Sequence, residues 1–378
     1  MKIFIMSDGF SIHTRRWVSA LVKRGIIIHL FSLKDFNESD YPHENFTYTV
    51  VDCQKRSAGW GGFGKIAYLK ALPELKKQIC KFVPDIVHAH FASSYGLLGA
   101  LSGFHPLIVS VWGSDVFDFP YKSFLHRKVF EFTLRKADKI LSTSNVMAVE
   151  AGKFTDKDIE ITPFGIDLND FSMNHGIKIR NNLKINEQDI VVGTIKLLEP
   201  KYGIEFLIKA FAQISEKHPA MPLKLVVAGD GSEKNKLYDI TAFLKIENKV
   251  VFTGMIDHAS VPDYINSFNI FAALSIEESF GVAVVEAQAC GVPVVVSDAG
   301  GLPEVVEDGV TGSIVPKKNV SAAADAIEKL VLDKDLREKM GKAGRNRVER
   351  LYNWNQNVDK MISIYNITLK DLTRDRNE

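Results

Sequence analysis

The chain contains few cysteines, almost no net charge and no long apolar run. Its three cysteines, Cys53, Cys80 and Cys290, are too few and too scattered for a disulfide framework or a cysteine-based zinc site, which favours the reducing cytoplasm. A formal net charge of +1 does not favour bulk binding of nucleic acid. No stretch reaches the roughly 18 uncharged apolar residues of a membrane span, and the apolar run before Ser7 is too short for a signal peptide. Any membrane contact is therefore expected from the surface.

A complete dinucleotide-binding fingerprint is also missing. The stretch "GWGGFG" at 59–64 has the G-x-G-x-x-G spacing, but "CQKRSA" separates it from the preceding strand-like residues. The acid that should close the next strand, Asp85, opens the strand "DIVHAHF" instead. After the first strand, where the fingerprint belongs, "SDGFSIH" contains a single glycine. These departures disfavour an NAD-dependent enzyme.

The sequence contains two successive series of strand-like and helix-like segments. The first series begins with "KIFIM" and "IIIHLFSL", which flank an amphipathic stretch at 13–24. The second includes "IVVGTI", "LKLVVAG" and "VPVVVS", whose nearly continuous apolar character fits strands covered on both faces. A chain of 378 residues is long for one core. The pattern therefore predicts two α/β domains, each a Rossmann-like parallel sheet built from βαβ units.

We predict a first domain over residues 1–170 and a second over residues 185–352. The polar stretch at 169–189 breaks the alternation and is expected to link the two. Residues 353–378 open with a predicted helix, from about Trp354, that lies beyond the strands of the second sheet.

Two basic segments raise the question of lipid binding. Residues 60–81 combine Trp60 and Phe63 with several lysines, and a second basic run lies at 122–139. Aromatic side chains beside lysines suit a membrane interface with anionic lipid. A solvated helix face behind a flexible loop explains the same residues.

The segment "ESFGVAVVEAQACGVPVVVS", residues 278–297, carries the strongest chemical signal. A helix is expected to begin near Gly281, where Ser279 can act as its cap and the glycine lets a ligand approach the backbone. A helix start favours a phosphate group. Glu286 then lies roughly 7 Å along the helix axis with its side chain directed back toward that start, where it can accept ribose hydroxyls. Alternatively, Glu286 is a buried structural acid and Glu278 a surface one.

The segment resembles the E-x7-E signature of retaining glycosyltransferases of family 4, which have the GT-B fold. Other segments of the chain resemble further family motifs and occur in the family's order: "PDIVHAHF", "TPFGID", "VGTIKLLEPKYG" and "VVAGDGSEKNKL" before the E-x7-E segment and "GGLPEVVEDGVTG" after it. The resemblance implies two Rossmann-like domains facing across a cleft, with the C-terminal helix crossing back to the first domain. Three positions depart from the family pattern: Lys196 replaces an arginine, Tyr202 is inserted before Gly203, and Phe164 replaces an asparagine. A lysine still neutralises phosphate, but as a point charge without the bidentate fork of arginine.

The resemblance implies roles for residues at matching positions. Lys196 and Lys201 would bind the donor diphosphate and stabilise the leaving group, Glu278 would contact the transferred sugar, and His90 would lie near the reacting carbon. The predicted catalytic residues are His90, Lys196, Lys201 and Glu278. The predicted donor-binding residues are Gly229, Asp230, Gly231, Thr253, Gly254, Ser279, Phe280, Gly281, Val282 and Glu286. The predicted acceptor-binding residues are Asp8, Gly9, His13 and Asp115.

Surface or structural roles would also explain several of these residues. Each lysine taken alone fits a solvated surface charge, and Asp115 fits a helix cap. His88 and His90 share one face of a strand and could begin a metal site, but no third ligand is evident. No D-x-D element accompanies "SD" at 7–8 or "GSD" at 113–115, and the lysines can supply the positive charge. We therefore expect neither a metal nor a cofactor.

The sequence thus predicts a cytoplasmic, metal-independent, retaining hexosyltransferase that uses a nucleotide-diphosphate sugar. The expected acceptor is a saccharide or a polyprenyl-linked saccharide for surface polysaccharide such as lipopolysaccharide or capsule, with peripheral contact at the inner membrane face. A GT-B phosphorylase or sugar-nucleotide epimerase is the alternative enzyme. A non-catalytic subunit that binds nucleotide sugar is the alternative of another class.

Overall fold

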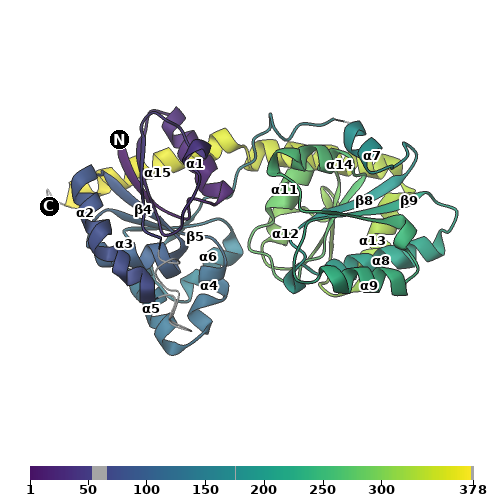
Figure 1. Ribbon diagram of the computed structural model, residues 1–378, viewed down its shortest axis with the longest axis horizontal. Helices are drawn as coiled ribbons and strands as arrows, with labels where there is room; N and C mark the ends of the chain where they lie inside the picture. The colour runs from purple at the N-terminus through teal and green to yellow at the C-terminus, as the bar shows by residue number, and fades with distance from the viewer. Residues whose placement is uncertain (53–65, 175, 376–378) are drawn as a thin grey trace. The chain divides into compact units, whose positions relative to one another are not determined.

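The computed structural model describes residues 1–52, 66–174 and 176–375 (Figure 1). Its internal contacts divide the chain into two compact units. The first unit comprises Met1–Pro163 and Gln356–Glu378, and the second comprises Phe164–Asn355. The glycine stretch at 59–64 and its tryptophan lie outside the described residues, so the predicted membrane role of that stretch stays a prediction.

The first unit is built on a seven-stranded parallel sheet with the order β3-β2-β1-β4-β5-β6-β7. Its central strands are mostly apolar and buried, as in "LIVSV" and in "KIFIM" after its exposed Lys2, because helices cover both faces. The strands are β1 (Lys2–Met6), β2 (Ile27–Ser32), β3 (Phe46–Val50), β4 (Ile86–His90), β5 (Leu107–Val111), β6 (Lys139–Ser142) and β7 (Ile159–Ile161).

The helices of the first unit bury one apolar face each. A core cluster joins the sheet to α2, α3 and α5 through side chains such as Leu75, Leu98 and Phe130. Ser123 and Ser144 cap α5 and α6 by accepting hydrogen bonds from backbone N–H groups of the first turn. The main helices are α1 (Ile12–Lys23), α2 (Leu72–Phe82), α3 (Gly96–Ser102), α4 (Ser114–Phe117), α5 (Phe124–Lys136), α6 (Asn145–Gly152) and the last helix, α15 (Trp354–Asp375).

The second unit has a six-stranded parallel sheet with the order β10-β9-β8-β11-β12-β13. Helices α8, α9 and α13 cover one face, and α7, α11 and α14 lie on the other (Figure 1). The strands are β8 (Ile190–Ile195), β9 (Leu223–Ala228), β10 (Val250–Gly254), β11 (Ile270–Ala273), β12 (Val294–Ser297) and β13 (Gly312–Val315). The helices are α7 (Ile177–Asn182), α8 (Ile204–Lys217), α9 (Lys234–Phe243), α10 (Val261–Asn266), α11 (Val282–Ala289), α12 (Leu302–Val305), α13 (Val320–Leu332) and α14 (Lys334–Leu351).

Both sheets reverse their strand order at one point, so the predicted fold class of two Rossmann-like parallel sheets is confirmed. The reversal lies between β1 and β4 in the first unit and between β8 and β11 in the second. In open α/β sheets, ligands bind outside the carboxyl ends of the strands at such a point. The carboxyl edge of each sheet is therefore the place to look for a site.

The predicted linker at 169–189 is wrong. This stretch contains helix α7 and belongs to the second unit, and the boundary lies earlier, between Pro163 and Phe164. Arg180 fastens it by donating to the backbone carbonyl of Ser267 and to the side chain of Asn269. Most of its polar side chains are exposed, as the sequence suggests, but buried residues such as Phe171, Ile179 and Ile185 tie the stretch to the second unit. The return to the first unit occurs at Gln356, inside α15.

Candidate active site

The loops at the carboxyl edge of the second sheet are fastened to one another by backbone contacts. The loop after β8 runs against the glycine loop after β9, because Leu198 N–H donates to the Asp230 carbonyl at 3.0 Å. Gly229 has a φ of 140°, and a Cβ there would stand 1.8 Å from the Lys196 carbonyl oxygen. Gly229 N–H also donates to the Gly254 carbonyl at the end of β10. The predicted nucleotide loops are therefore brought together on one edge.

Lys196 and Glu278 form the central ion pair of this edge. Lys196 Nζ lies 2.5 Å from Glu278 Oε2, and the two side chains are only 13% and 12% exposed. Burial works against the charge of Lys196, but the Glu278 carboxylate beside it raises the lysine pKa above its usual value. Lys196 therefore carries a full positive charge at neutral pH, held by a residue of the E-x7-E segment.

The inserted tyrosine lies between the two predicted phosphate-binding lysines. Lys196 Nζ is 4.7 Å from the centroid of the Tyr202 ring, and Lys201 Nζ is 5.2 Å from the same centroid. Both distances suit a cation–π interaction. Tyr202 ends the short 3-10 turn Pro200–Tyr202, and Gly203 follows with a φ of 61°. The insertion thus places one aromatic ring against two cations.

The Lys201 loop is also joined to the E-x7-E segment. The carbonyl oxygen of Lys201 accepts hydrogen bonds from the N–H groups of Ile276 and Glu277 at 2.7 and 3.2 Å. Gly301 N–H in turn donates to the carbonyl of Glu278 at 2.9 Å. The backbone therefore holds both lysines and Glu278 in one constellation.

Glu286 is the fifth residue of α11 and is 5% exposed. Its Oε1 lies 3.8 Å from His258 Nε2, so the imidazole of the loop after β10 faces this carboxylate. No motif points to His258, because His258 and Glu286 meet only in the folded unit. The predicted cap is wrong: Gly281, at φ 102°, is the N-cap of α11, and no side chain caps that helix. Ser279 lies two residues before the N-cap.

Asp230 and Thr253 contact their own loops. Asp230 accepts a hydrogen bond from the backbone N–H of Gly231 at 2.8 Å and from Lys234 Nζ at 2.9 Å, and these bonds lower the pKa of its carboxyl. Thr253 donates its hydroxyl to the carbonyl of Gly254. These contacts fix the glycine turns and leave the nucleotide role of the loops a prediction.

Phe280 belongs to a row of aromatic rings beneath the loop. Its ring lies 5.9 Å from that of Phe164 and 5.8 Å from that of Tyr352. Phe164, which replaces the family's asparagine, is buried in this row. The departure from the family pattern therefore supports packing near the E-x7-E segment. Val282 is the first residue of α11.

In the first unit, His90 lies at the carboxyl end of β4, beside the end of β1. Its Nδ1 is 2.9 Å from Ser7 Oγ, and its ring is tilted against Trp112 with centroids 4.2 Å apart. Burial, with smaller contributions from the neighbouring His88 and His13, holds the His90 pKa well below its usual value. A neutral imidazole that is 3% exposed therefore lies at the sheet's switch point.

Both ring nitrogens of His88 make hydrogen bonds within the first unit. Its Nδ1 lies 2.8 Å from the hydroxyl of Tyr365 on α15, and its Nε2 lies 2.8 Å from Ser110 Oγ on β5. Burial lowers the pKa of His88 to about 3. Within the described part of the chain, no three His, Cys, Asp or Glu side chains gather as metal ligands would.

Asp8 and Gly9 lie in the loop after β1. Asp8 Oδ2 lies 2.6 Å from Lys34 Nζ. Asp8 and Lys34 line a cavity of about 190 Å³ together with Tyr68 and Phe91. Gly9 is packed so closely that a Cβ would stand 2.2 Å from the Phe36 ring. Lys34 is not predictable as a site residue from the sequence, because it lies beyond β2 and reaches Asp8 only in the folded sheet.

Asp115 and His13 both contact Trp112. Asp115 is 1% exposed and accepts hydrogen bonds from the backbone N–H groups of Ala92, Trp112 and Gly113. These bonds favour the structural alternative for Asp115, although its place is inside the first turn of α4 and not at the N-cap. His13 meets the Trp112 ring edge-on with centroids 6.1 Å apart.

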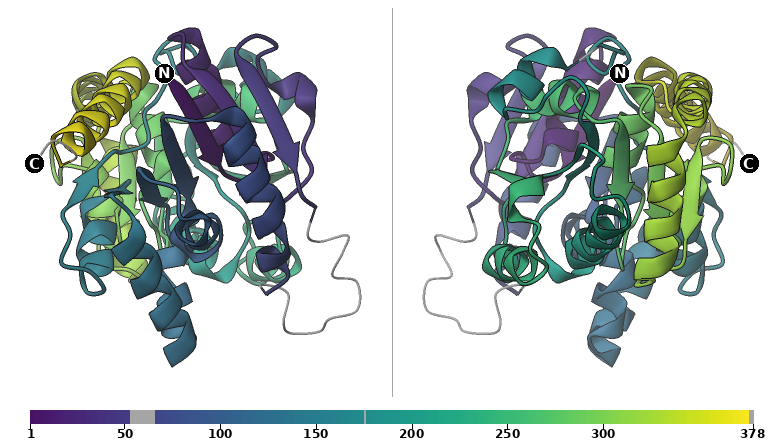
Figure 2. Two further views of the ribbon diagram at one scale, coloured as in Figure 1. Left: turned by 90° about the vertical axis from the view of Figure 1, so that its left-hand side faces the viewer. Right: turned by 90° about the vertical axis from the view of Figure 1, so that its right-hand side faces the viewer.

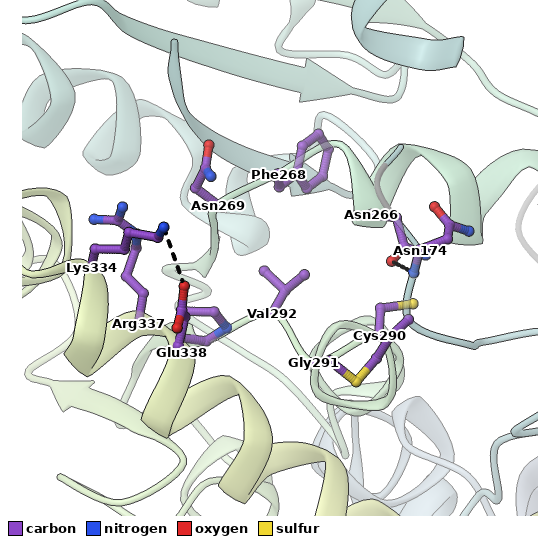
Figure 3. Close-up of a pocket in the computed structure, with 12 residues that line it drawn as sticks. Asn174, Asn266, Phe268, Asn269, Cys290, Gly291, Val292, Lys334, Arg337 and Glu338 are labelled. Atoms are coloured by element: carbon purple, nitrogen blue, oxygen red, sulfur yellow. Dashed lines mark hydrogen bonds and ion pairs between the residues drawn. The ribbon is translucent and has the colours of Figure 1, made fainter. Parts of the chain in front are cut away.

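A separate pocket of about 360 Å³ lies at the opposite, amino edge of the second sheet (Figure 3). Phe268 and Asn269, which precede β11, line it together with Val292, which precedes β12. The side-chain amide of Asn266 in this pocket already has a structural partner, because its Oδ1 accepts a hydrogen bond from the N–H of Asn174. None of the predicted site residues lies there, so this pocket is distinct from the carboxyl-edge constellation.

Two family models match the chain. The model for "Glycosyl transferases group 1" matches residues 177–347, within the second unit, and the model for "Glycosyl transferase 4-like" matches residues 2–144, within the first. Each match covers most of one sheet and its edge loops.

The chain is also similar to individual glycosyltransferases. The chain is 26% identical over 330 residues to a D-inositol 3-phosphate glycosyltransferase of Kribbella flavida, covering 77% of this chain and 76% of the relative. It is 29% identical over 208 residues to the capsular polysaccharide biosynthesis glycosyltransferase CapM of Staphylococcus aureus, covering 55% of this chain and 54% of the relative. The match thus spans about half the length of CapM.

A solved structure supports the fold. Sucrose-phosphate synthase from Thermosynechococcus elongatus aligns with a TM-score of 0.85 at 22% identity, covering 98% of this chain and 100% of that one. At this identity the likeness bears on the fold alone. The two family matches and the two parallel-sheet units thus show a glycosyl transferase 4-like domain followed by a group 1 glycosyltransferase domain, in a GT-B type of fold.

Proposed function

We propose that the protein is a retaining, metal-independent hexosyltransferase that moves a sugar from a nucleotide-diphosphate sugar to a lipid-linked saccharide in surface polysaccharide biosynthesis. The observation that carries the proposal is the constellation of Lys196, Lys201, Glu278 and Glu286 around one edge of the second sheet. The polysaccharide context draws on the match to CapM, whose name refers to capsular polysaccharide.

The diphosphate is assigned to the two lysines and the start of α11. The first turn of a helix presents N–H groups that lack partners within the helix, and the glycine at position 281 allows close approach. Lys196 is ion-paired with Glu278. The arriving diphosphate would replace that carboxylate as the partner of Lys196 and so release Glu278 to accept a hydroxyl of the sugar.

The reaction then follows from the charges. The bond between the anomeric carbon and the β-phosphate oxygen breaks, an acceptor hydroxyl oxygen bonds to the anomeric carbon, and the hydroxyl proton is released. Negative charge builds up on the leaving diphosphate, where two preorganised lysines stabilise it most. These lysines supply the charge that a metal ion supplies in other transferases, which supports metal independence.

Glu286 is assigned to the ribose hydroxyls. Its burial beside His258 keeps the carboxylate in one position, and its place on α11 directs it toward the helix start. The glycine loops at 229–231 and 253–254 then meet the base through backbone groups. The E-x7-E spacing and the family resemblance support retention of the anomeric configuration.

The first unit is assigned to the acceptor, and the cavity lined by Asp8 and Lys34 is its proposed binding place there. Neutral His90 would accept or donate a hydrogen bond near the reacting carbon without adding charge. Asp8, Gly9 and His13 stay the proposed acceptor contacts. Among the described helices, none combines the length and apolar character that a membrane crossing needs.

Turnover of a panel of nucleotide sugars, with and without polyprenyl-linked acceptor and with EDTA present, tests the proposal. Product formed only with acceptor supports it. Donor converted without acceptor indicates an epimerase, phosphorolysis of a glycan indicates a phosphorylase, and donor binding without any conversion indicates a non-catalytic subunit.

A matched pair of lysine variants localises the activity. Lys201→Ala is expected to lower kcat by ~10²-fold or more, because one developing charge loses its partner. Lys342→Ala removes an exposed lysine on α14 and is expected to leave kcat unchanged. Equal activity in both variants would return Lys201 to a surface role.

A further inference from the structure

Large apolar side chains are exposed at the start of α5 in the first unit. Tyr121, in the turn before α5, is 58% exposed, and Phe124 and Leu125 on α5 are 75% and 69% exposed, whereas Phe130 on α5 is completely buried. Ser123 caps the helix, so its first turn is well formed and the apolar residues are not needed to start it. The helix extends away from the strands of its unit (Figure 2). Exposed apolar groups that cluster in this way mark an interaction surface.

Tyr121 also contacts α6. The hydroxyl of Tyr121 donates to the carboxylate of Glu150, and the Tyr121 ring meets that of Phe154 with centroids 5.9 Å apart. We define the docking surface as Tyr121, Phe124 and Leu125.

Cations surround the docking surface. Lys128 Nζ lies 5.4 Å from the centroid of the Phe124 ring, and Arg127 lies 5.4 Å from that of Phe154. The side chains of Arg127, Lys128 and Lys153 are 54%, 53% and 58% exposed. Lys122 adds a further exposed cation.

Three of these cations are paired with acids that are less exposed than they are. Glu131 pairs with Arg127 and Lys128, Glu150 pairs with Lys153, and the two acids are 25% and 18% exposed. Asp118 is an exposed acid of the same stretch. Because the cations are the more exposed members of these pairs and Lys122 adds to them, they are the charges that a negatively charged partner would meet.

We propose that the docking surface binds an anionic lipid bilayer. Aromatic and aliphatic side chains would enter the boundary between headgroups and acyl chains, while the surrounding cations would contact lipid phosphates. A protein partner would use the same apolar groups without needing this rim of cations. The inference rests on the proposed function in one respect, since a lipid-linked acceptor would be met at such a surface.

Co-sedimentation of the full chain with vesicles tests the proposal. Binding is expected to vesicles that contain phosphatidylglycerol, to be weak for pure phosphatidylcholine, and to fall as salt increases. The double variant Phe124→Ser/Leu125→Ser is expected to lose ~10-fold or more of that affinity. Phe243→Ser, which changes an 85% exposed phenylalanine of the second unit, is the matched control and is expected to bind like the unchanged protein.

Two further readouts separate the outcomes. Nucleotide binding by calorimetry should be the same in the double variant and the unchanged protein, so a failure of the docking surface is distinguished from a failure of the proposed donor site. Equal vesicle binding by the double variant, or no binding by the unchanged protein, would overturn the proposal. Conversion of a dimer to a monomer by the double variant would also overturn it and assign the surface to a second copy.

Discussion

At the level of single residues, the Tyr202 ring is the feature that distinguishes this site. It contacts two ammonium groups at 4.7 and 5.2 Å, and each such contact contributes roughly 0.5 to 2 kcal/mol depending on desolvation. Tyr202→Ala is expected to lower kcat/KM for the nucleotide sugar by ~10-fold, because both lysines gain freedom. Tyr202→Phe keeps the ring and should retain most of the activity. An alanine variant as active as the phenylalanine variant would show that the ring does not position the lysines.

Buried histidines predict how the stability of the first unit depends on pH. Burial lowers the pKa of His88 to about 3, and burial with the nearby Lys81 charge lowers that of His29 to about 4. The unfolded chain binds these protons near pH 6.5, so the folded state holds fewer protons below that pH. Stability is therefore fully present above about pH 6.5 and falls as the pH drops, by up to about 1.4 kcal/mol per pH unit for each histidine.

Urea unfolding at a series of pH values checks this dependence. His88→Gln should make the slope between pH 6 and 4 shallower by about one proton. His43→Gln, which changes an exposed histidine, should leave the slope as it is. A His88→Gln slope equal to that of the unchanged protein would mean that His88 is protonated in the folded state.

The charged residues of the donor site could be predicted from the sequence because their motif spacing is local to each loop. Lys196, Lys201 and Glu278 were expected in one site, and the structure joins them. The contacts of Tyr202 and His258 could not be predicted in this way. Tyr202 shares the loop after β8 with both lysines, but the 3-10 turn at Pro200–Tyr202 decides where its ring lies, and His258 meets Glu286 only in the folded unit.

At the level of elements, the start of α11 is the most constrained point. Gly281 has a φ of 102°, and a Cβ there would stand 2.8 Å from the Leu302 side chain. Gly281→Ala is expected to cost roughly 1 to 3 kcal/mol of stability because the alanine must adopt a strained backbone. The same change should weaken nucleotide binding. Gly103→Ala also places a residue at positive φ, 76°, but has open space around it and lies in the first unit, so it should leave nucleotide affinity unchanged.

The helices with clear period and clear ends match their sequence patterns. The amphipathic stretch at 13–24 forms α1 (Ile12–Lys23), and the helix expected from about Trp354 forms α15, which begins at that residue. The stretch at 169–189 reads as a linker because most of its polar side chains are exposed, yet Arg180 bonds to Ser267 and Asn269 and so fastens it to the second unit. Composition alone does not separate such an anchored residue from the solvated ones around it.

At the level of the whole molecule, the second unit is one uninterrupted piece of chain, Phe164–Asn355, with its own sheet and core. The first unit needs both ends of the chain, because Tyr365 of α15 contributes the partner of His88. Residues 164–355 expressed alone are expected to fold and to bind the donor nucleotide. Circular dichroism and calorimetry check both expectations. A fragment that is folded but does not bind nucleotide would place part of the donor site elsewhere.

The most direct measurement is calorimetric binding of UDP, GDP and ADP to the full chain with EDTA present, repeated for Glu286→Ala. The proposed donor site predicts that one nucleotide binds with a dissociation constant in the micromolar range. Glu286→Ala is expected to weaken this binding by ~10-fold or more, because the ribose hydroxyls lose the carboxylate that accepts their hydrogen bonds. Failure of all three nucleotides to bind, or an unchanged dissociation constant in Glu286→Ala, would contradict the assignment of the carboxyl edge of the second sheet as the donor site.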